Sequence, residues 1–82
     1  MKIYKKQVQV VGISHRVGSK QDGKNYDFYQ LHVTYEDSST EGIATSALII
    51  PDYVATNIDM GKPATLFSHF AAGREYFDDI YQ

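Results

Sequence analysis

The alternation of hydrophobic and polar residues along the chain predicts five short β-strands separated by polar or glycine-containing turns. The expected strands are residues 3–15, 26–35, 43–50, 64–71 and 75–81. Residues 51–57, between the third and fourth strands, begin with a proline and suit one or two helical turns. Residues 17–25 have the composition of a hairpin loop. The pattern therefore predicts an all-β protein without a long helix.

The first expected strand changes face part-way along its length. The alternation breaks at Val10-Val11-Gly12, and a glycine at such a break indicates a β-bulge or a sharp bend. Small barrels use such bends, and closing a sheet into a barrel removes its exposed edges. We expect residues 1–82 to form a single domain built as a small five-stranded antiparallel barrel. An SH3-like barrel and a small open sandwich are the alternatives.

The second expected strand has two different faces. One face is apolar or aromatic and suits a core: Tyr29, Leu31, Val33 and Tyr35. The other combines two rings with amide, imidazole and hydroxyl groups: Tyr26, Phe28, Gln30, His32 and Thr34. Exposed rings of this kind can stack on nucleic-acid bases, although aromatic residues are also common in strands for packing alone.

Charge is distributed unevenly along the 82 residues, whose formal net charge is −2. Residues 1–24 hold six basic residues and one acidic residue, whereas residues 25–82 hold two basic and nine acidic residues. A net charge of this size argues against a strongly cationic nucleic-acid binder, but the asymmetry favours a local surface for an anionic partner. Arg16, Lys20 and Lys24 flank the loop before the aromatic strand, where they could follow phosphates.

Residues 18–33 read GSKQDGKNYDFYQLHV, in which Gly23-Lys24-Asn25-Tyr26 leads into Asp27-Phe28-Tyr29. This stretch resembles a motif of small single-stranded DNA-binding proteins of phages and plasmids, such as the helix-destabilising proteins of filamentous phages. Residues 58–64 are similar to the turn that feeds the fourth strand of those proteins. The acidic balance of residues 25–82 departs from the family.

The resemblance implies a Greek-key barrel of the OB-fold type and a non-catalytic protein that coats single-stranded DNA during phage or plasmid replication. It also implies a homodimer, and RNA stays open as a further ligand. The lack of cysteine and of a signal-peptide pattern favours the cytoplasm, which the resemblance makes that of a bacterial host. The DNA contacts implied by position are Arg16, Lys20, Lys24, Tyr26 and Phe28, with Lys6, Gln30, His32 and Lys62 as additional candidates.

Other chemistry has little support in the sequence. There is no cysteine, and His15, His32 and His69 fall on three different expected strands without metal-ligand spacing. No activated nucleophile or phosphate-binding motif occurs, so we expect no enzymatic activity, cofactor, metal or small-molecule substrate. The short apolar runs also predict no membrane partner.

Two questions stay open at this point. The first is whether the acidic, tyrosine-rich part of the chain makes the protein an interaction module, such as a small barrel assembly factor of a phage or mobile element. The second concerns the C-terminal EYFDDIYQ, which suits either a closing strand or a tail that recruits a partner.

Overall fold

The computed structural model describes residues 2–82, which form a five-stranded antiparallel sheet with one short helix. The elements are β1 (Tyr4–Ser19), β2 (Asn25–Tyr35), β3 (Ala44–Ile50), α1 (Asp52–Asn57), β4 (Pro63–Ala71) and β5 (Arg74–Tyr81). The strand order across the sheet is β3-β2-β1-β4-β5. The expected all-β class and the five strands are confirmed, and the C-terminal segment is a strand paired with β4. The short α1 cannot span a membrane, and residues 2–82 contain no helix that could.

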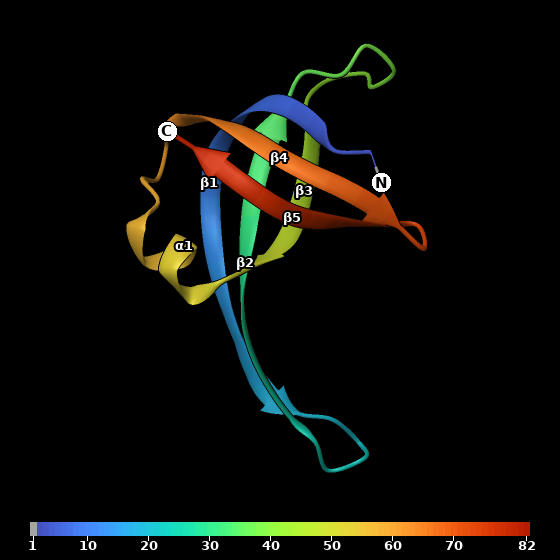
Figure 1. Cartoon of the computed structure of the whole chain (residues 1–82), viewed down its shortest axis with the longest axis vertical. Coiled ribbons are helices and arrows are strands. Elements are labelled where there is room, and N and C mark those ends of the chain that lie inside the picture. Colours follow the sequence, from blue (N-terminus) through green and yellow to red (C-terminus); the bar gives the residue numbers. More distant parts are fainter. Residues whose placement is uncertain (1) are drawn as a thin grey trace.

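The sheet is strongly coiled, so that β4 and β5 cross in front of the other three strands (Figure 1). Its two edge strands, β3 and β5, come into contact, but no backbone ladder joins them within residues 2–82. The expected closed barrel is therefore corrected to a coiled sheet with an unpaired seam between β3 and β5. Alternation along a strand shows which side chains face the core, whereas closure depends on strand tilt and stagger, which alternation does not fix.

The predicted bulge lies at Val11. Val10 pairs with Val33 and Gly12 pairs with His32, so Val11 has no partner on β2. Val10 is fully buried, while Val11 is 57% exposed. Before the bulge the even-numbered residues of β1 face the core, and after it the odd-numbered residues do, beginning with Ile13.

β1 and β2 continue beyond the body of the protein as a two-stranded arm, which projects downward in Figure 1. The pairing runs as far as Ser19 and Asn25, so the connecting loop is confined to residues 20–24. Residues 17–19, expected in the loop, belong to the strand instead. The arm lengthens the molecule, whose extents are 42 × 28 × 26 Å.

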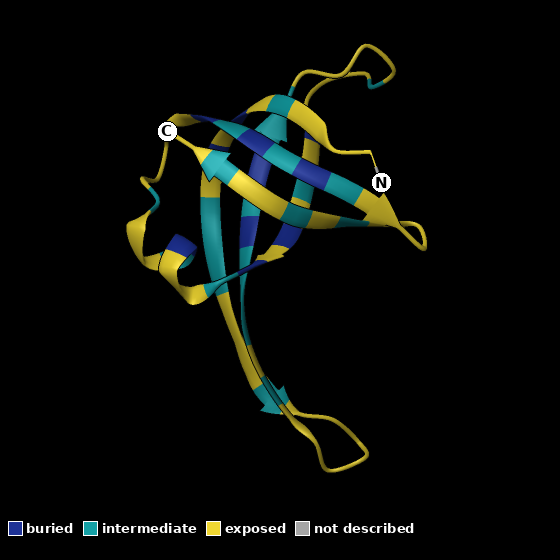
Figure 2. Ribbon diagram, in the orientation of Figure 1, coloured by how far each residue is buried: buried dark blue, intermediate teal, exposed yellow. Residues whose placement is uncertain are grey.

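The core lies between the coiled halves of the sheet, and Figure 2 shows its buried residues concentrated in the body and absent from the arm. Its largest fully buried apolar side chains are Leu31, Leu48 and Leu66. Val54 of α1 adds to one end of this core. On β2, Leu31 and Val33 are buried as expected, and Tyr29 and Tyr35 are half-buried against the same cluster.

Candidate nucleic-acid interface

The arm presents two rings and an arginine on its outer face. In the antiparallel register Arg16 is opposite Phe28 and Gly18 is opposite Tyr26, and residues directly opposite each other share a face. The centroids of the Tyr26 and Phe28 rings are 5.9 Å apart, with a 37° angle between the ring planes. Both side chains are only half-buried. The structure thus brings three of the expected contact residues together on one surface.

Two lysines stand at the end of the arm because of a tight turn. The Lys20 amide donates to the Lys24 carbonyl at 2.7 Å, and the Gly23 amide donates to the Lys20 carbonyl at 3.0 Å. Gly23 has φ +84°, a conformation that favours glycine. Within residues 2–82, neither lysine forms an ion pair, and nor does Arg16. Their charges are therefore available to an anionic ligand.

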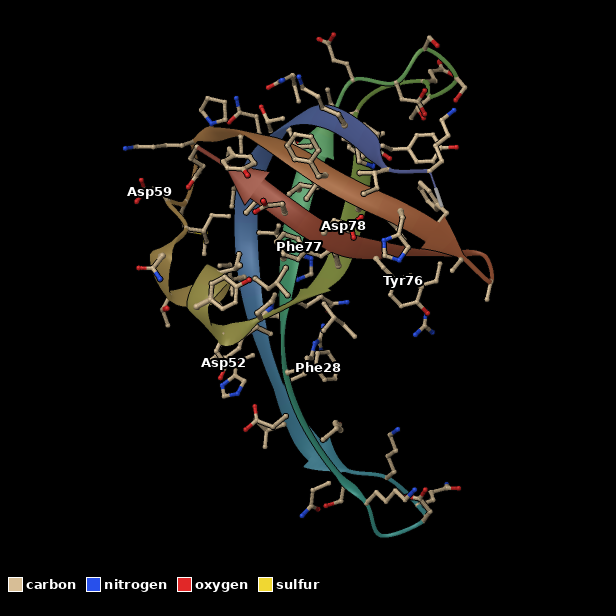
Figure 3. The ribbon with its side chains drawn as sticks, viewed as in Figure 1. Phe28, Asp52, Asp59, Tyr76, Phe77 and Asp78 are labelled. Atoms are coloured by element: carbon tan, nitrogen blue, oxygen red, sulfur yellow. The ribbon has the colours of Figure 1, made fainter. Side chains whose placement is uncertain are left out.

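A groove of about 340 Å³ continues the outer face of the arm across the body of the protein. It is lined by Phe28, Gln30, Ala47, Ile49, Arg74, Glu75 and Tyr76. Figure 3 labels Phe28 on β2 and Tyr76 on β5, and both side chains line this groove. We call the outer face of the arm, its loop and this groove together the arm–groove surface.

Gln30 and His32 follow Phe28 along β2 but have different surroundings. Gln30 lines the groove, where its amide can both donate and accept hydrogen bonds. The His32 ring lies further along the strand, with its Nε2 2.7 Å from the Ser14 Oγ. His32 is thus adjacent to the groove and already has one protein partner.

Lys6 does not line the arm–groove surface, although its ion-pair partner Glu75 does. Its Nζ is 2.9 Å from the Glu75 Oε2 and 4.1 Å from the centroid of the Tyr35 ring. The two charged side chains are 20% and 10% exposed, respectively. A larger hollow of about 490 Å³ lies beside Lys6 and Tyr35, but the ammonium is engaged within the protein rather than free for a phosphate.

Glu75 connects this ion pair with the strand next to it. Burial raises the pKa of its carboxyl, but hydrogen bonds from Ser68 and Lys6 outweigh that effect and leave the pKa below its usual value. The Ser68 hydroxyl donates to the Glu75 Oε2 at 2.6 Å, and Ser68 is fully buried. The network fixes the start of β5 to β1 and β4 beside the unpaired seam.

Lys62 also lies away from the arm–groove surface. It belongs to the turn before β4 and is 3.8 Å from the Asp59 Oδ2. Figure 3 shows Asp59 at the upper left, on the far side of the molecule from Phe28 and Tyr76. The structure does not bring Lys62 together with the other expected contacts.

Arg74 and Tyr76 were missed by reasoning from the sequence. The sequence placed Arg74 in a turn and Tyr76 in a segment that suits a closing strand or a partner-recruiting tail, and it predicted neither as a nucleic-acid contact. A signal was present, because Arg74 is one of only two basic residues after residue 24 and lies two positions before an aromatic residue. On a β-strand that spacing places both side chains on one face.

The three histidines have separate partners. His15 Nε2 is 2.6 Å from Asp27, and His69 Nδ1 is 2.8 Å from Asp78, whereas His32 contacts Ser14. Across residues 2–82, no three histidine or carboxylate side chains converge as a possible set of metal ligands.

Comparison of the chain with protein-family models, with curated proteins and with solved structures finds no match in any of the three. The functional argument therefore rests on the geometry of the arm–groove surface.

Proposed function

We propose that the protein binds single-stranded DNA, with little sequence preference, along the arm–groove surface. The observation that carries this proposal is the shared face of Tyr26, Phe28 and Arg16, next to the free lysines of the loop. Stacking of a base on an aromatic ring contributes about 1–3 kcal/mol and tolerates every base. The cationic side chains would follow the phosphates, a contribution that does not depend on sequence.

The course of the strands supports an OB-fold as the finer description of the sheet. The order β3-β2-β1-β4-β5, with β3 and β5 in contact, supports a description as a five-stranded Greek-key barrel opened along one seam. OB-folds bind oligonucleotides on the face of their second and third strands, between the β1–β2 and β4–β5 loops. The groove here is lined from β2, β3 and the start of β5, and the arm is the β1–β2 hairpin.

The arrangement favours single strands over duplexes. A base can stack on Tyr26 or Phe28 only when one of its own faces is free, which is not the case inside a stacked duplex. Rings and cations do not by themselves distinguish deoxyribose from ribose, so RNA is a competing ligand to be measured.

A second candidate function is protein binding, and one surface favours it. Ile3, Phe67 and Tyr81 surround a hollow of about 190 Å³ that is also lined by Asp78 and Asp79. Such a mixture of apolar and acidic groups suits a partner with apolar and basic side chains. Lys5, which is opposite Phe67 on β1, also forms no ion pair within residues 2–82. Four other basic residues without an ion pair in that range lie in the arm–groove surface together with exposed rings, and this co-location favours the nucleic-acid proposal: Arg16, Lys20, Lys24 and Arg74.

Titration of a labelled oligo-dT with the protein tests the proposal, with duplex DNA and oligo-U as competitors. We expect tighter binding to the single strand than to the duplex. Tyr26→Ala and Phe28→Ala should each weaken binding by about 1–3 kcal/mol. Tyr53→Ala is the matched control, because Tyr53 is an exposed ring on α1 outside the arm–groove surface. Unchanged affinity in both folded arm variants, or equal affinity for the duplex, would refute the proposal.

A further inference from the structure

The ring of Tyr76, in the groove, is stacked on a histidine that is itself hydrogen-bonded to an aspartate. Tyr76 lines the groove and is 41% exposed. Its ring is stacked on His69, with centroids 5.4 Å apart and a 17° angle between the planes. His69 Nδ1 is in turn 2.9 and 2.8 Å from the two carboxylate oxygens of Asp78.

We propose that Tyr76 is a third base-stacking ring and that His69 and Asp78 are positioning residues that hold it in place. This inference rests on the proposed binding of single-stranded DNA. It adds a ligand contact on β5 and two residues that influence affinity without touching the nucleic acid.

The register of the sheet explains how the three side chains meet. His69 on β4 is directly opposite Tyr76 on β5, so the two rings share the outer face. The pairing then shifts, because Phe67 pairs with Asp79 and Ser68 pairs with Phe77, which leaves Asp78 as an extra residue. This irregularity brings the Asp78 carboxylate to the same outer face, within hydrogen-bonding distance of His69.

Tyr76 is exposed enough to contact a ligand, whereas the side chains of His69 and Asp78 are largely covered. The side chains of His69 and Asp78 are 19% and 23% exposed, although Asp78 as a whole residue is exposed, so the two interacting side chains are partly sheltered. Stacking on a sheltered and hydrogen-bonded ring restricts the rotamers of Tyr76 before any ligand arrives. Less side-chain entropy is then lost when a base stacks on it.

Tyr76 lies in the groove that continues from the arm, where a nucleic-acid strand bound to Tyr26 and Phe28 would pass. Phe28 and Tyr76 line the same groove from different strands of the sheet. Arg74 is two residues before Tyr76, also lines the groove and forms no ion pair within residues 2–82. A strand stacked on Tyr26 and Phe28 would thus meet a further ring and a further cation on crossing the groove.

A double-mutant cycle on oligo-dT affinity tests the inference. Tyr76→Ala should weaken binding about 5- to 150-fold, the range for loss of one stacked base. His69→Ala should weaken it about 2- to 12-fold, the range for one aromatic pair. Because His69 acts through Tyr76, the double variant should bind no more weakly than Tyr76→Ala alone.

Conservative variants separate positioning from general damage to the sheet. His69→Phe keeps a ring against Tyr76, whereas His69→Asn keeps a donor for Asp78 without a ring, so the Phe variant should retain more affinity. His15→Ala is the matched control, since His15 is stacked on Tyr29 at 4.4 Å and paired with Asp27 on the opposite face of the arm. That control should leave affinity unchanged.

The NMR shifts of the Tyr76 ring in the free protein give a readout that needs no ligand, and they should move in His69→Ala and Asp78→Asn. Full additivity of the two alanine changes, or unchanged affinity in a folded His69→Ala protein, would overturn the inference while leaving the proposed function intact. Failure of the unmodified protein to bind oligo-dT would overturn both.

Discussion

The ring of Tyr26 occupies the space that a side chain at position 18 would fill. A Cβ atom at Gly18 would lie 2.6 Å from the Cζ and 2.9 Å from the Cε2 of Tyr26, closer than non-bonded atoms approach. Gly18 does not have a positive φ, so its backbone conformation does not itself call for glycine. A side chain at position 18 would instead force the end of the Tyr26 side chain to shift, because the ring of the opposite residue lies across β1 at this position.

Gly18→Ala should therefore displace the Tyr26 ring from the outer face of the arm. We expect a loss of oligo-dT affinity no larger than that of Tyr26→Ala, about 1–3 kcal/mol, measured by fluorescence titration. Gly12→Ala is the control, because a Cβ there would meet the His32 side chain at an ordinary 3.8 Å. Equal affinity of Gly18→Ala and the unmodified protein would show that the position of this ring does not matter for binding.

The basic groups of the arm should determine the salt dependence of binding. Each phosphate neutralised on a single strand contributes about −0.7 to the slope of log K against log salt. Replacing Arg16, Lys20 and Lys24 together by alanine should make the slope less steep by up to about 2. Titrations at several salt concentrations measure this change.

Lys62→Ala provides the matched control for charge. The Lys62 ammonium lies near Asp59, outside the arm–groove surface, so this variant should keep the slope of the unmodified protein. A slope that falls equally in the Lys62 variant and in the triple variant would contradict the placement of the phosphate contacts.

The ion pair between Lys6 and Glu75 should make stability depend on pH. The pKa of Glu75 is lowered in the folded protein, so its contribution is present above the unfolded pKa and is lost as pH falls through the folded pKa. Glu75→Gln should lower the free energy of unfolding at pH 7 by about 1–3 kcal/mol, because the Lys6 ammonium is left without its carboxylate partner. The difference between variant and unmodified protein should shrink below about pH 4.5, the ordinary pKa of glutamate.

Urea unfolding at a series of pH values checks this expectation. Asp59→Asn breaks the exposed pair with Lys62 and should change stability by less than about 1 kcal/mol. A Glu75→Gln difference that persisted unchanged at low pH would show that the carboxylate charge is not what stabilises the start of β5.

Much of the sheet could be predicted from the sequence, because strands with one buried face alternate apolar and polar residues. Leu31 and Val33 mark the core face of β2, and the break at Val11 marks the bulge. The end of β1 in the arm shows no such periodicity, because its residues are held by cross-strand pairing with β2 and not by a core. For that reason its strand residues 17–19 looked like a loop.

The candidate site was predictable only where its residues are adjacent in the chain. Tyr26 and Phe28 alternate on one strand, so their common face could be predicted from spacing alone. Arg74 and Tyr76 join them through the coiling of the sheet, which no local pattern encodes. Lys6 looked free in the sequence because its partner Glu75 is 69 positions away.

The single unpaired residue at Val11 has a consequence for the whole arm. It acts as a phase shift, because every residue of β1 beyond it faces the side opposite to the one that uninterrupted alternation would give. If Val11 instead paired with His32 and the ladder continued without a bulge, Arg16 and Gly18 would lie on the inner side of the arm, and His15 and Val17 would lie opposite Phe28 and Tyr26. The looping out of one residue near the middle of a strand thus decides which side chains the distant hairpin displays on its outer face.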